Sequence, residues 1–197
     1  MDVKTQSQKI VDRRNGLKSR LISIGAEKFA TKGVENVSVE EIIDQAEIAR
    51  STFYGFYSNK EELLKDIVRP VFKLGIQKFL ELDAGDPTEL ILGIAGVYVT
   101  LWERDHYALS LAFRLANKYF LLIKDLHLQY MEAIQKLVTI AEDAGILRDG
   151  NANYSSRLIA RSAIPILEVY GKDDNYRELF LKSMQGLLLK QDAGCPN

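Results

Sequence analysis

The sequence has few of the residues and runs that mark disulfide-rich, membrane-spanning or metal-binding proteins. Among 197 residues there is one cysteine, Cys195, which excludes an internal disulfide and a cysteine-based metal site within one chain. The two histidines, His106 and His127, lack the spacing of a histidine metal pair, so no metal site is expected. The longest apolar runs are far too short to span a bilayer, and the polar amino terminus lacks a signal-peptide pattern. We therefore expect a soluble, cytoplasmic protein.

Motifs of the common enzyme classes are also missing. The sequence contains no nucleophile elbow, no glycine-rich phosphate loop and no zinc-hydrolase motif. We therefore expect neither an enzyme nor a cofactor. An all-helical enzyme with paired carboxylates remains the third hypothesis, and a deep pocket holding a strongly perturbed carboxyl would favour it.

The net charge of −1 gives no overall field toward nucleic acid, but the charge is unevenly distributed. The first 20 residues contain two acidic and six basic side chains, the latter being Lys4, Lys9, Arg13, Arg14, Lys18 and Arg20. This segment has two interpretations. Either it is a basic arm that reaches DNA phosphates or a minor groove, or it is a solvated, disordered tail.

Helical periodicity dominates the chain, prolines number only four, and no stretch alternates like a strand. The pattern predicts an all-α protein of about nine helices. Their expected ranges are Asn15–Lys32, a second helix ending at Ala46, Arg50–Tyr57, a fourth reaching Leu82, Pro87–Arg104, His106–Asn117, Phe120–Ala144, Asn153–Tyr170 and Asn175–Lys190. Three short helices thus precede a long fourth helix and a bundle of longer, more apolar helices.

Two helix starts carry strong local signals. Ser38 is a good N-cap and Glu41, three residues later, completes a capping box. Asn59 stands in the same relation to Glu62 and predicts the start of the fourth helix. The second and third helices, joined by a short turn, form a candidate helix-turn-helix.

The third helix divides into two arcs when its residues are placed at about 100° intervals. Bulky aromatic residues make up the arc expected to anchor the helix, namely Phe53, Phe56 and Tyr57. Small or polar residues make up the other arc, Arg50, Ser51, Tyr54 and Gly55, with Thr52 between the two. A guanidinium, hydroxyls and a glycine gap are the groups that contact base edges and phosphates in a major groove. Lys60 and Ser38, each at a helix amino terminus, are expected phosphate contacts.

The stretch from about Leu21 to Leu64 resembles the DNA-binding domain of the tetracycline-repressor (TetR) family. The resemblance rests on Ala26, Phe29, Gly33, Ser38, Ile42, Ala46, Ile48, Thr52, Phe53, Tyr54, Phe56, Tyr57, Lys60, Glu61 and Leu63. It implies that residues 1–58 form a basic arm and a helix-turn-helix domain, and residues 59–192 a helical ligand-binding and dimerisation domain. Residues 193–197 are expected to be a loose tail. The DNA-facing positions it implies are Ser38, Arg50, Ser51, Thr52, Tyr54, Gly55 and Lys60.

Three residues depart from the family pattern. Glu47 occupies a position usually held by glycine, where a left-handed turn costs a non-glycine residue about 1 kcal/mol. Ala49 replaces a frequent serine N-cap, and Phe56 replaces a frequent histidine. These departures motivate an alternative function, a helical ligand- or partner-binding protein with a vestigial helix-turn-helix.

The remaining helices are rich in apolar residues with a few polar groups. Two interpretations fit this pattern: either these residues form an ordinary core, or they line a pocket for a small apolar or aromatic ligand. The candidate lining residues are Tyr98, Trp102, His127 and Tyr130. The last two helices have wide apolar faces, which suggest either an intermolecular four-helix bundle across a two-fold axis or burial within the monomer. The candidate dimer contacts are Leu158, Ile166, Tyr170, Phe180, Met184 and Leu187.

These features together predict a homodimeric regulator, a repressor in our first hypothesis, that binds a near-palindromic DNA operator. A small ligand would release it by binding one dimer spacing better than the other. The long fourth helix, which contains Pro70, would carry the change between the two domains.

Overall fold

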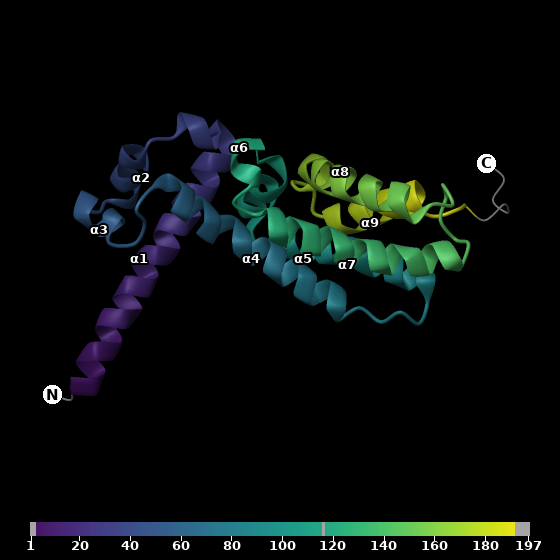
Figure 1. Ribbon diagram of the computed structural model, residues 1–197, viewed down its shortest axis with the longest axis horizontal. Helices are drawn as coiled ribbons and strands as arrows, with labels where there is room; N and C mark the ends of the chain where they lie inside the picture. Colours follow the sequence, from purple (N-terminus) through teal and green to yellow (C-terminus); the bar gives the residue numbers. More distant parts are fainter. Residues whose placement is uncertain (1–2, 116, 192–197) are drawn as a thin grey trace. The chain divides into compact units, whose positions relative to one another are not determined.

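The computed structural model describes the backbone of residues 3–115 and 117–191, and the side chains of residues 8–115 and 119–191. The predicted all-α class is confirmed, since no strand occurs in those residues. The helices are α1 (Val3–Lys32), the 3₁₀ turn η1 (Val34–Asn36), α2 (Val39–Ala46), α3 (Arg50–Tyr54), α4 (Lys60–Leu80), α5 (Pro87–Arg114), α6 (Asn117–Phe120), α7 (Lys124–Asp143), α8 (Ala152–Tyr170) and α9 (Tyr176–Leu188), as labelled in Figure 1. The expected tail, residues 193–197, lies outside the described residues.

Several helix boundaries differ from the expected ones. α1 begins at Val3 rather than near Asn15, because residues 8–16 are all exposed and so leave no apolar periodicity to detect. α5 continues to Arg114, but Asp105 interrupts it with φ −167° and ψ 94°, at the predicted division between two helices. The Asp105 carboxylate accepts a hydrogen bond of 2.9 Å from the Ala108 N–H and so acts as a cap for the second half.

The chain divides into two compact units that are discontinuous in sequence. The first comprises Met1–Pro70 and Ser110–Ile123, and the second comprises Val71–Leu109 and Lys124–Asn197. Residues 110–123 thus join the helix-turn-helix segment in one unit, an association that the sequence patterns did not predict.

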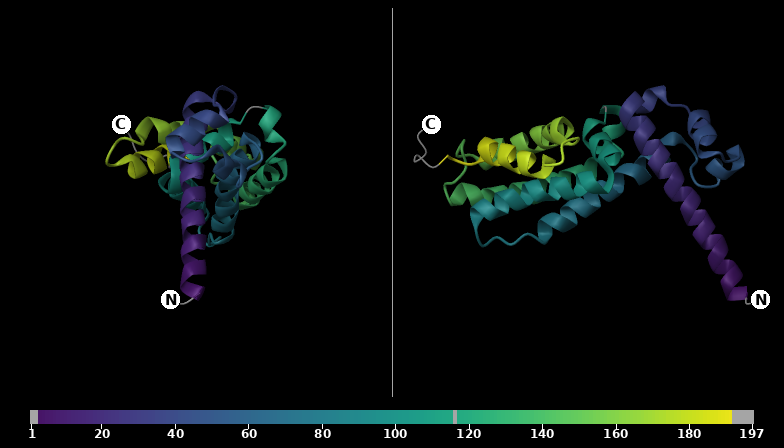
Figure 2. Two further views of the ribbon diagram at one scale, coloured as in Figure 1. Left: turned by 90° about the vertical axis from the view of Figure 1, so that its left-hand side faces the viewer. Right: turned by 180° about the vertical axis from the view of Figure 1, so that it is seen from behind.

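The core of the first unit forms where α1, η1, α2 and α3 pack in succession. Its centre consists of fully buried side chains from four helices, including Leu21, Phe29, Ile42, Phe53 and Leu63. Each buried Leu, Ile or Phe stabilises the unit by roughly 1.5–3 kcal/mol relative to an exposed one. This packing leaves one side of α3 outside the core. Figures 1 and 2 show the amino-terminal half of α1 extending beyond α2 and α3.

In the second unit, α8 packs against both α7 and α9. An aromatic cluster lies in its core: the Tyr130 ring contacts Phe72, Phe79 and Tyr98 edge-on, with centroid distances of 5.6, 5.0 and 6.2 Å. Gly75 permits this arrangement, because a Cβ atom there would stand 2.4 Å from Cε2 of Tyr130.

No helix in the described part of the chain is long and apolar enough to cross a membrane.

Candidate functional site

The turn between α2 and α3 has the geometry that its sequence suggested. Glu47 adopts the left-handed conformation, with φ 50° and ψ 47°, and it is the only described residue other than glycine with a positive φ. Its N–H donates to the carbonyls of Asp44 and Ile43, which ends α2. Ala49 then opens α3 without a side-chain cap. The strained turn and the missing cap are both real features of this helix-turn-helix.

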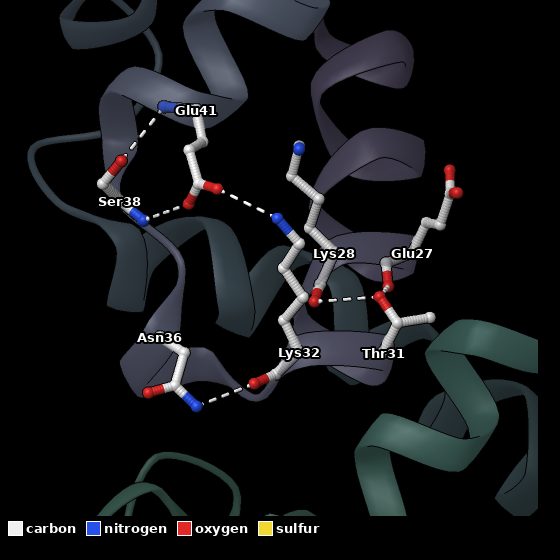
Figure 3. A network of polar contacts seen from close by, with 7 residues as sticks. All are labelled: Glu27, Lys28, Thr31, Lys32, Asn36, Ser38 and Glu41. Atoms are coloured by element: carbon white, nitrogen blue, oxygen red, sulfur yellow. Dashed lines mark hydrogen bonds and ion pairs between the residues drawn. The ribbon is translucent and has the colours of Figure 1, made fainter.

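The predicted capping box at the start of α2 is confirmed and belongs to a larger network (Figure 3). The Ser38 Oγ atom accepts a bond of 3.1 Å from the Glu41 N–H, and the Glu41 carboxylate accepts one of 3.0 Å from the Ser38 N–H. Lys32, at the end of α1, forms an ion pair of 3.0 Å with Glu41. The bond from Ser38 and the Lys32 ammonium lower the pKa of the Glu41 carboxyl. The Ser38 side chain is exposed, and its hydroxyl proton is not used in the capping box.

α3 has one buried side and one exposed side. Phe53 and Tyr57 are at most 3% exposed, and so they anchor the helix as expected. The backbone bond from the Tyr57 N–H to the Phe53 carbonyl, 3.0 Å, carries a helical turn past the end of α3. The exposed or half-exposed residues are Arg50, Ser51, Thr52, Tyr54 and Gly55, which are the predicted DNA-facing residues of this helix.

The Arg50 guanidinium lies on the exposed side and has two neighbours. It forms an ion pair of 3.1 Å with the exposed Glu40 of α2, and its Cζ atom lies 5.6 Å from the Tyr54 ring centroid. Surface ion pairs of this kind contribute about 0–1 kcal/mol, so a stronger anionic partner can replace Glu40. The Tyr54 side chain is 44% exposed, so it is among the few large hydrophobic side chains of this unit that reach the surface.

Two expectations around α3 need correction. Phe56 is half-exposed rather than a core residue, and the Arg14 guanidinium lies 5.3 Å from its ring centroid. Lys60 does not present a free ammonium to a phosphate. Its Nζ donates to the carbonyls of Val34, Val37 and Glu35 at 2.6, 3.1 and 3.4 Å. An ammonium has three N–H donors, so in this structure Lys60 stabilises the loop before α2.

A second charge cluster fixes the carboxy-terminal end of the α3 turn. Asp66 forms an ion pair of 2.7 Å with Lys18 and accepts a bond of 3.2 Å from the Tyr57 hydroxyl. Burial raises the pKa of the Tyr57 phenol, and the nearby Asp66 carboxylate raises it further. Tyr57 is therefore a permanent hydrogen-bond donor at neutral pH and ties α3 to α4.

The predicted ligand-lining residues do not all lie together. Tyr98, His127 and Tyr130 belong to the aromatic cluster of the second unit, where the His127 ring lies 6.1 Å from Phe72. Burial raises the pKa of both tyrosines and lowers that of His127. Trp102 lies against Gly171 and 5.3 Å from the His106 ring.

The predicted dimer contacts also divide into two groups. Phe180 and Met184 are fully buried within the chain, so they stabilise the packing of α9 and offer no surface to a partner. Leu158, Ile166, Tyr170 and Leu187 are half-exposed. Exposed apolar residues that the sequence analysis had not selected follow one side of α8, namely Tyr154, Pro165 and Val169.

The resolved pKa shifts of carboxyl groups all go in one direction among the described residues. Each carboxyl with a resolved shift has a lowered pKa, because of a hydrogen bond from Ser38 to Glu41, from Lys78 to Glu81 and from Lys182 to Glu178. Groups of three or more potential metal ligands are likewise absent from the described chain.

Comparisons with known proteins agree with this geometry. The model of the family described as "Bacterial regulatory proteins, tetR family" matches residues 21–67, which include α2, the turn and α3. The sequence has no match among the curated proteins.

Solved structures resemble the chain over most of its length. The ketosteroid transcriptional regulator KstR2 of Mycobacterium tuberculosis has a TM-score of 0.74 at 20% identity, covering 88% of this chain and 95% of that one. The TetR family regulator PfmR from Thermus thermophilus has a TM-score of 0.71 at 18% identity, with coverages of 89% and 97%. The fatty acid degradation regulator FadR from Bacillus halodurans has a TM-score of 0.67 at 16% identity, with coverages of 87% and 94%.

At these identities the solved structures establish the fold, and the family match identifies the segment that carries the helix-turn-helix. Residues 21–67 are thus similar to the amino-terminal domain of the tetR family of bacterial regulatory proteins, and the chain has the fold of solved regulators of that family.

Proposed function

We propose that the chain is a ligand-responsive transcription regulator, a repressor, that binds a near-palindromic operator as a homodimer in the cytoplasm. The observation that carries this proposal is the two-sided environment of α3. Phe53 and Tyr57 hold one side in the core, while Arg50 and Tyr54 stand on the exposed side. An exposed helix anchored in this way can enter a major groove, where arginine pairs with guanine and a phenol contacts bases or phosphates.

Dimerisation is proposed through α8 and α9. The apolar side chains Tyr154 and Val169 on α8 are 60% and 73% exposed, and Leu158 and Pro165 continue the same stripe. Residues spaced by three, four or seven positions share one helix face, so the stripe can pack against its own copy across a two-fold axis. A two-fold dimer of this kind has two copies of α3, which matches the two half-sites of a near-palindromic operator.

The proposed effector is a small apolar or aromatic molecule that binds at the aromatic cluster of the second unit. Tyr98 and Tyr130 are fully buried there with their rings edge-on at a centroid distance of 6.2 Å, which gives an otherwise apolar site two phenol groups. The solved relatives that are a ketosteroid regulator and a fatty acid degradation regulator support an apolar effector. Because the rings fill the cluster, an effector must displace them, and binding would therefore select a different packing.

The coupling between effector and operator follows from differential affinity. An effector that binds one arrangement of the dimer more tightly shifts the population toward it, and reciprocally DNA weakens effector binding by the same factor. α4 belongs to both units, with the division at Pro70, and is the proposed connection.

DNA binding by variants of α3 tests the proposal. The probe is duplex DNA flanking the chain's own gene, with a scrambled duplex as competitor. We expect Arg50→Ala and Tyr54→Ala each to weaken specific binding by roughly 1–3 kcal/mol, while Arg104→Ala in the second unit serves as a charge control without effect. Unchanged affinity in both α3 variants would show that Arg50 and Tyr54 do not contact the DNA as proposed.

The alternative, a ligand- or partner-binding protein with a vestigial helix-turn-helix, is favoured by three observations. Glu47 strains the turn, Ala49 leaves α3 uncapped, and Lys60 is engaged with backbone carbonyls. A salt titration separates the two functions, because a DNA complex weakens steeply as salt rises. A failure to form any complex at low salt would favour the alternative.

A further inference from the structure

A small cavity lies inside the first unit, where the end of α1 meets the end of α5. Its volume is about 140 Å³. Phe29 and Ala30 of α1, Val34 of η1 and Leu111 of α5 contribute to its lining. All described residues that line it fall within Met1–Pro70 and Ser110–Ile123, so the cavity belongs entirely to the unit that carries the helix-turn-helix.

Local backbone geometry explains why these segments border a common space. The Gly33 N–H donates to the Phe29 carbonyl at 3.0 Å, and Gly33 has φ 84°, which ends α1 and turns the chain into η1. On α5, Ser110 and Leu111 precede Arg114 by four and three positions, so these three lining residues share one helix face. The cavity is therefore bordered by a helix end, a 3₁₀ turn and a helix face.

Apolar side chains make up the buried part of the lining. Phe29, Val34 and Leu111 are each at most 5% exposed. Two hydroxyl-bearing residues, Ser110 and Tyr119, also line the cavity and are 8% and 2% exposed. An apolar interior with a few polar groups is the usual character of a small-molecule site.

Charge and size restrict the kind of molecule that fits. The two charged residues of the lining, Glu35 and Arg114, have opposite signs and are both exposed, so the cavity offers no net charge to a ligand. Burying a charged ligand in an apolar site costs free energy, and an uncharged ligand avoids that cost. An apolar cavity of about 150 Å³ holds a benzene molecule, so a cavity of about 140 Å³ suits a single aromatic ring.

The η1 wall of the cavity is held in place before any ligand arrives. The Lys60 ammonium donates to the carbonyls of Val34 and Glu35 at 2.6 and 3.4 Å, and the Asn36 side chain donates to the Lys32 carbonyl at 2.9 Å. A site that is already ordered loses less conformational entropy when it binds a ligand.

We infer that this cavity is a second small-molecule site, which binds an uncharged molecule with one aromatic ring and one hydrogen-bonding group. The ring would contact Phe29, Val34 and Leu111, and the polar group would bond to the Ser110 or Tyr119 hydroxyl. The site is separate from the effector site proposed at the aromatic cluster of the second unit. The inference does not rest on the proposed DNA-binding function, because it follows from the lining of the cavity alone.

Titration calorimetry with phenol tests the assignment. Ala30→Leu places a larger side chain at the cavity and keeps a strong helix former, so phenol affinity should fall roughly tenfold or more. Ala133→Leu is the matched control, since Ala133 is a half-exposed alanine on α7 and does not line the cavity. Circular dichroism confirms that both variants are folded. An absence of phenol binding to the wild-type chain, or an unchanged affinity in Ala30→Leu, would overturn the inference.

A variant that enlarges the cavity gives an independent test. Leu111→Ala removes buried atoms from the lining, and the cavity that remains should accept two fused rings. We therefore expect 2-naphthol to bind more tightly to Leu111→Ala than to the wild-type chain, and to raise the thermal stability of this variant more. An equal affinity of 2-naphthol for the two proteins would show that the ligand binds elsewhere.

Charged analogues test the ligand class. Benzoate and benzylammonium have the same ring and opposite charges, and each should bind the wild-type chain more weakly than phenol. Tighter binding of either ion would overturn the assignment of an uncharged ligand.

Amide hydrogen exchange locates the bound ring. The Asn36 N–H bonds to the Gly33 carbonyl at 3.2 Å, beside the cavity, so its exchange should slow when phenol is added. The same amide should show no such change in Ala30→Leu. Protection by phenol confined to the second unit would contradict the proposed site and would instead favour the aromatic cluster.

Discussion

The Lys60 Nζ atom lies 2.6 Å from the carbonyl oxygen of Val34, and this contact joins two segments separated by 26 positions in sequence. The same ammonium reaches the carbonyl of Val37 at 3.1 Å. Lys60 opens α4, whereas Val34 and Val37 flank the loop that leads into α2. One cation therefore bonds to backbone carbonyls on both sides of this segment, and it fixes the entry to the helix-turn-helix.

Lys60→Met should destabilise the protein because it leaves these carbonyls without their charged donor. We expect a loss of about 1–3 kcal/mol in the free energy of unfolding, measured by urea titration. Lys65→Met, on the next turn of α4, removes a lysine for which no such bonds are found and is the matched control. The salt slope of DNA binding should be unchanged in Lys60→Met. A stable variant with a reduced slope would instead identify Lys60 as a phosphate contact.

Glu47→Gly should stabilise the turn between α2 and α3. The left-handed conformation at φ 50° costs a residue with a Cβ atom roughly 1–2 kcal/mol. Glu47→Ala keeps that strain and loses the same exposed ion pair with Arg20, which makes it the control. The free energy of unfolding of the glycine variant should therefore be about 1 kcal/mol higher than that of the alanine variant. Equal stabilities would show that the turn is not strained.

Gly75→Ala and Gly96→Ala should act in opposite directions. A Cβ atom at Gly75 would stand 2.4 Å from the Tyr130 ring, and overpacking of this kind costs about 1–3 kcal/mol. At Gly96, within α5, a Cβ atom would meet nothing within 4 Å, so the higher helix propensity of alanine should stabilise the protein by about 0.5–1 kcal/mol. Thermal unfolding of both variants measures the difference. Destabilisation by Gly96→Ala would contradict the packing described for α5.

His127 should make stability depend on pH in a defined window. Burial lowers its pKa, so the unfolded chain binds this proton more readily than the folded chain. This difference in proton binding leaves the free energy of unfolding unchanged above the ordinary histidine pKa of about 6.5. It lowers the free energy of unfolding as pH falls below that value. Unfolding free energies of wild type and His127→Gln should therefore converge at acid pH, with the exposed His106→Gln as control. A constant difference across this window would show that His127 titrates alike in both states.

Local features of the fold were predictable from sequence because their partners lie within a few residues. The bonds between Ser38 and Glu41 form as expected, and the Glu62 N–H donates to the Asn59 side chain at 2.9 Å. The left-handed Glu47 and the burial of Phe53 likewise follow from turn chemistry and helix periodicity.

Features that depend on distant partners were not predictable in this way. Lys60 bonds to backbone carbonyl groups. Every residue has such a group, so no residue type in the sequence marks the partners of Lys60. α9 has an apolar face wide enough to serve two partners, and only the packed structure shows that Phe180 and Met184 point inward.

The central claim is that the exposed side of α3 enters a major groove, and chemical protection of guanine N7 atoms tests it most directly. With a duplex selected for binding from a random pool, the wild-type chain should protect N7 atoms in two tracts centred about one helical turn, roughly 10–10.5 base pairs, apart. Arg50→Ala/Tyr54→Ala should lose this protection. Protection confined to the minor groove, or an identical pattern with the double variant, would contradict the claim.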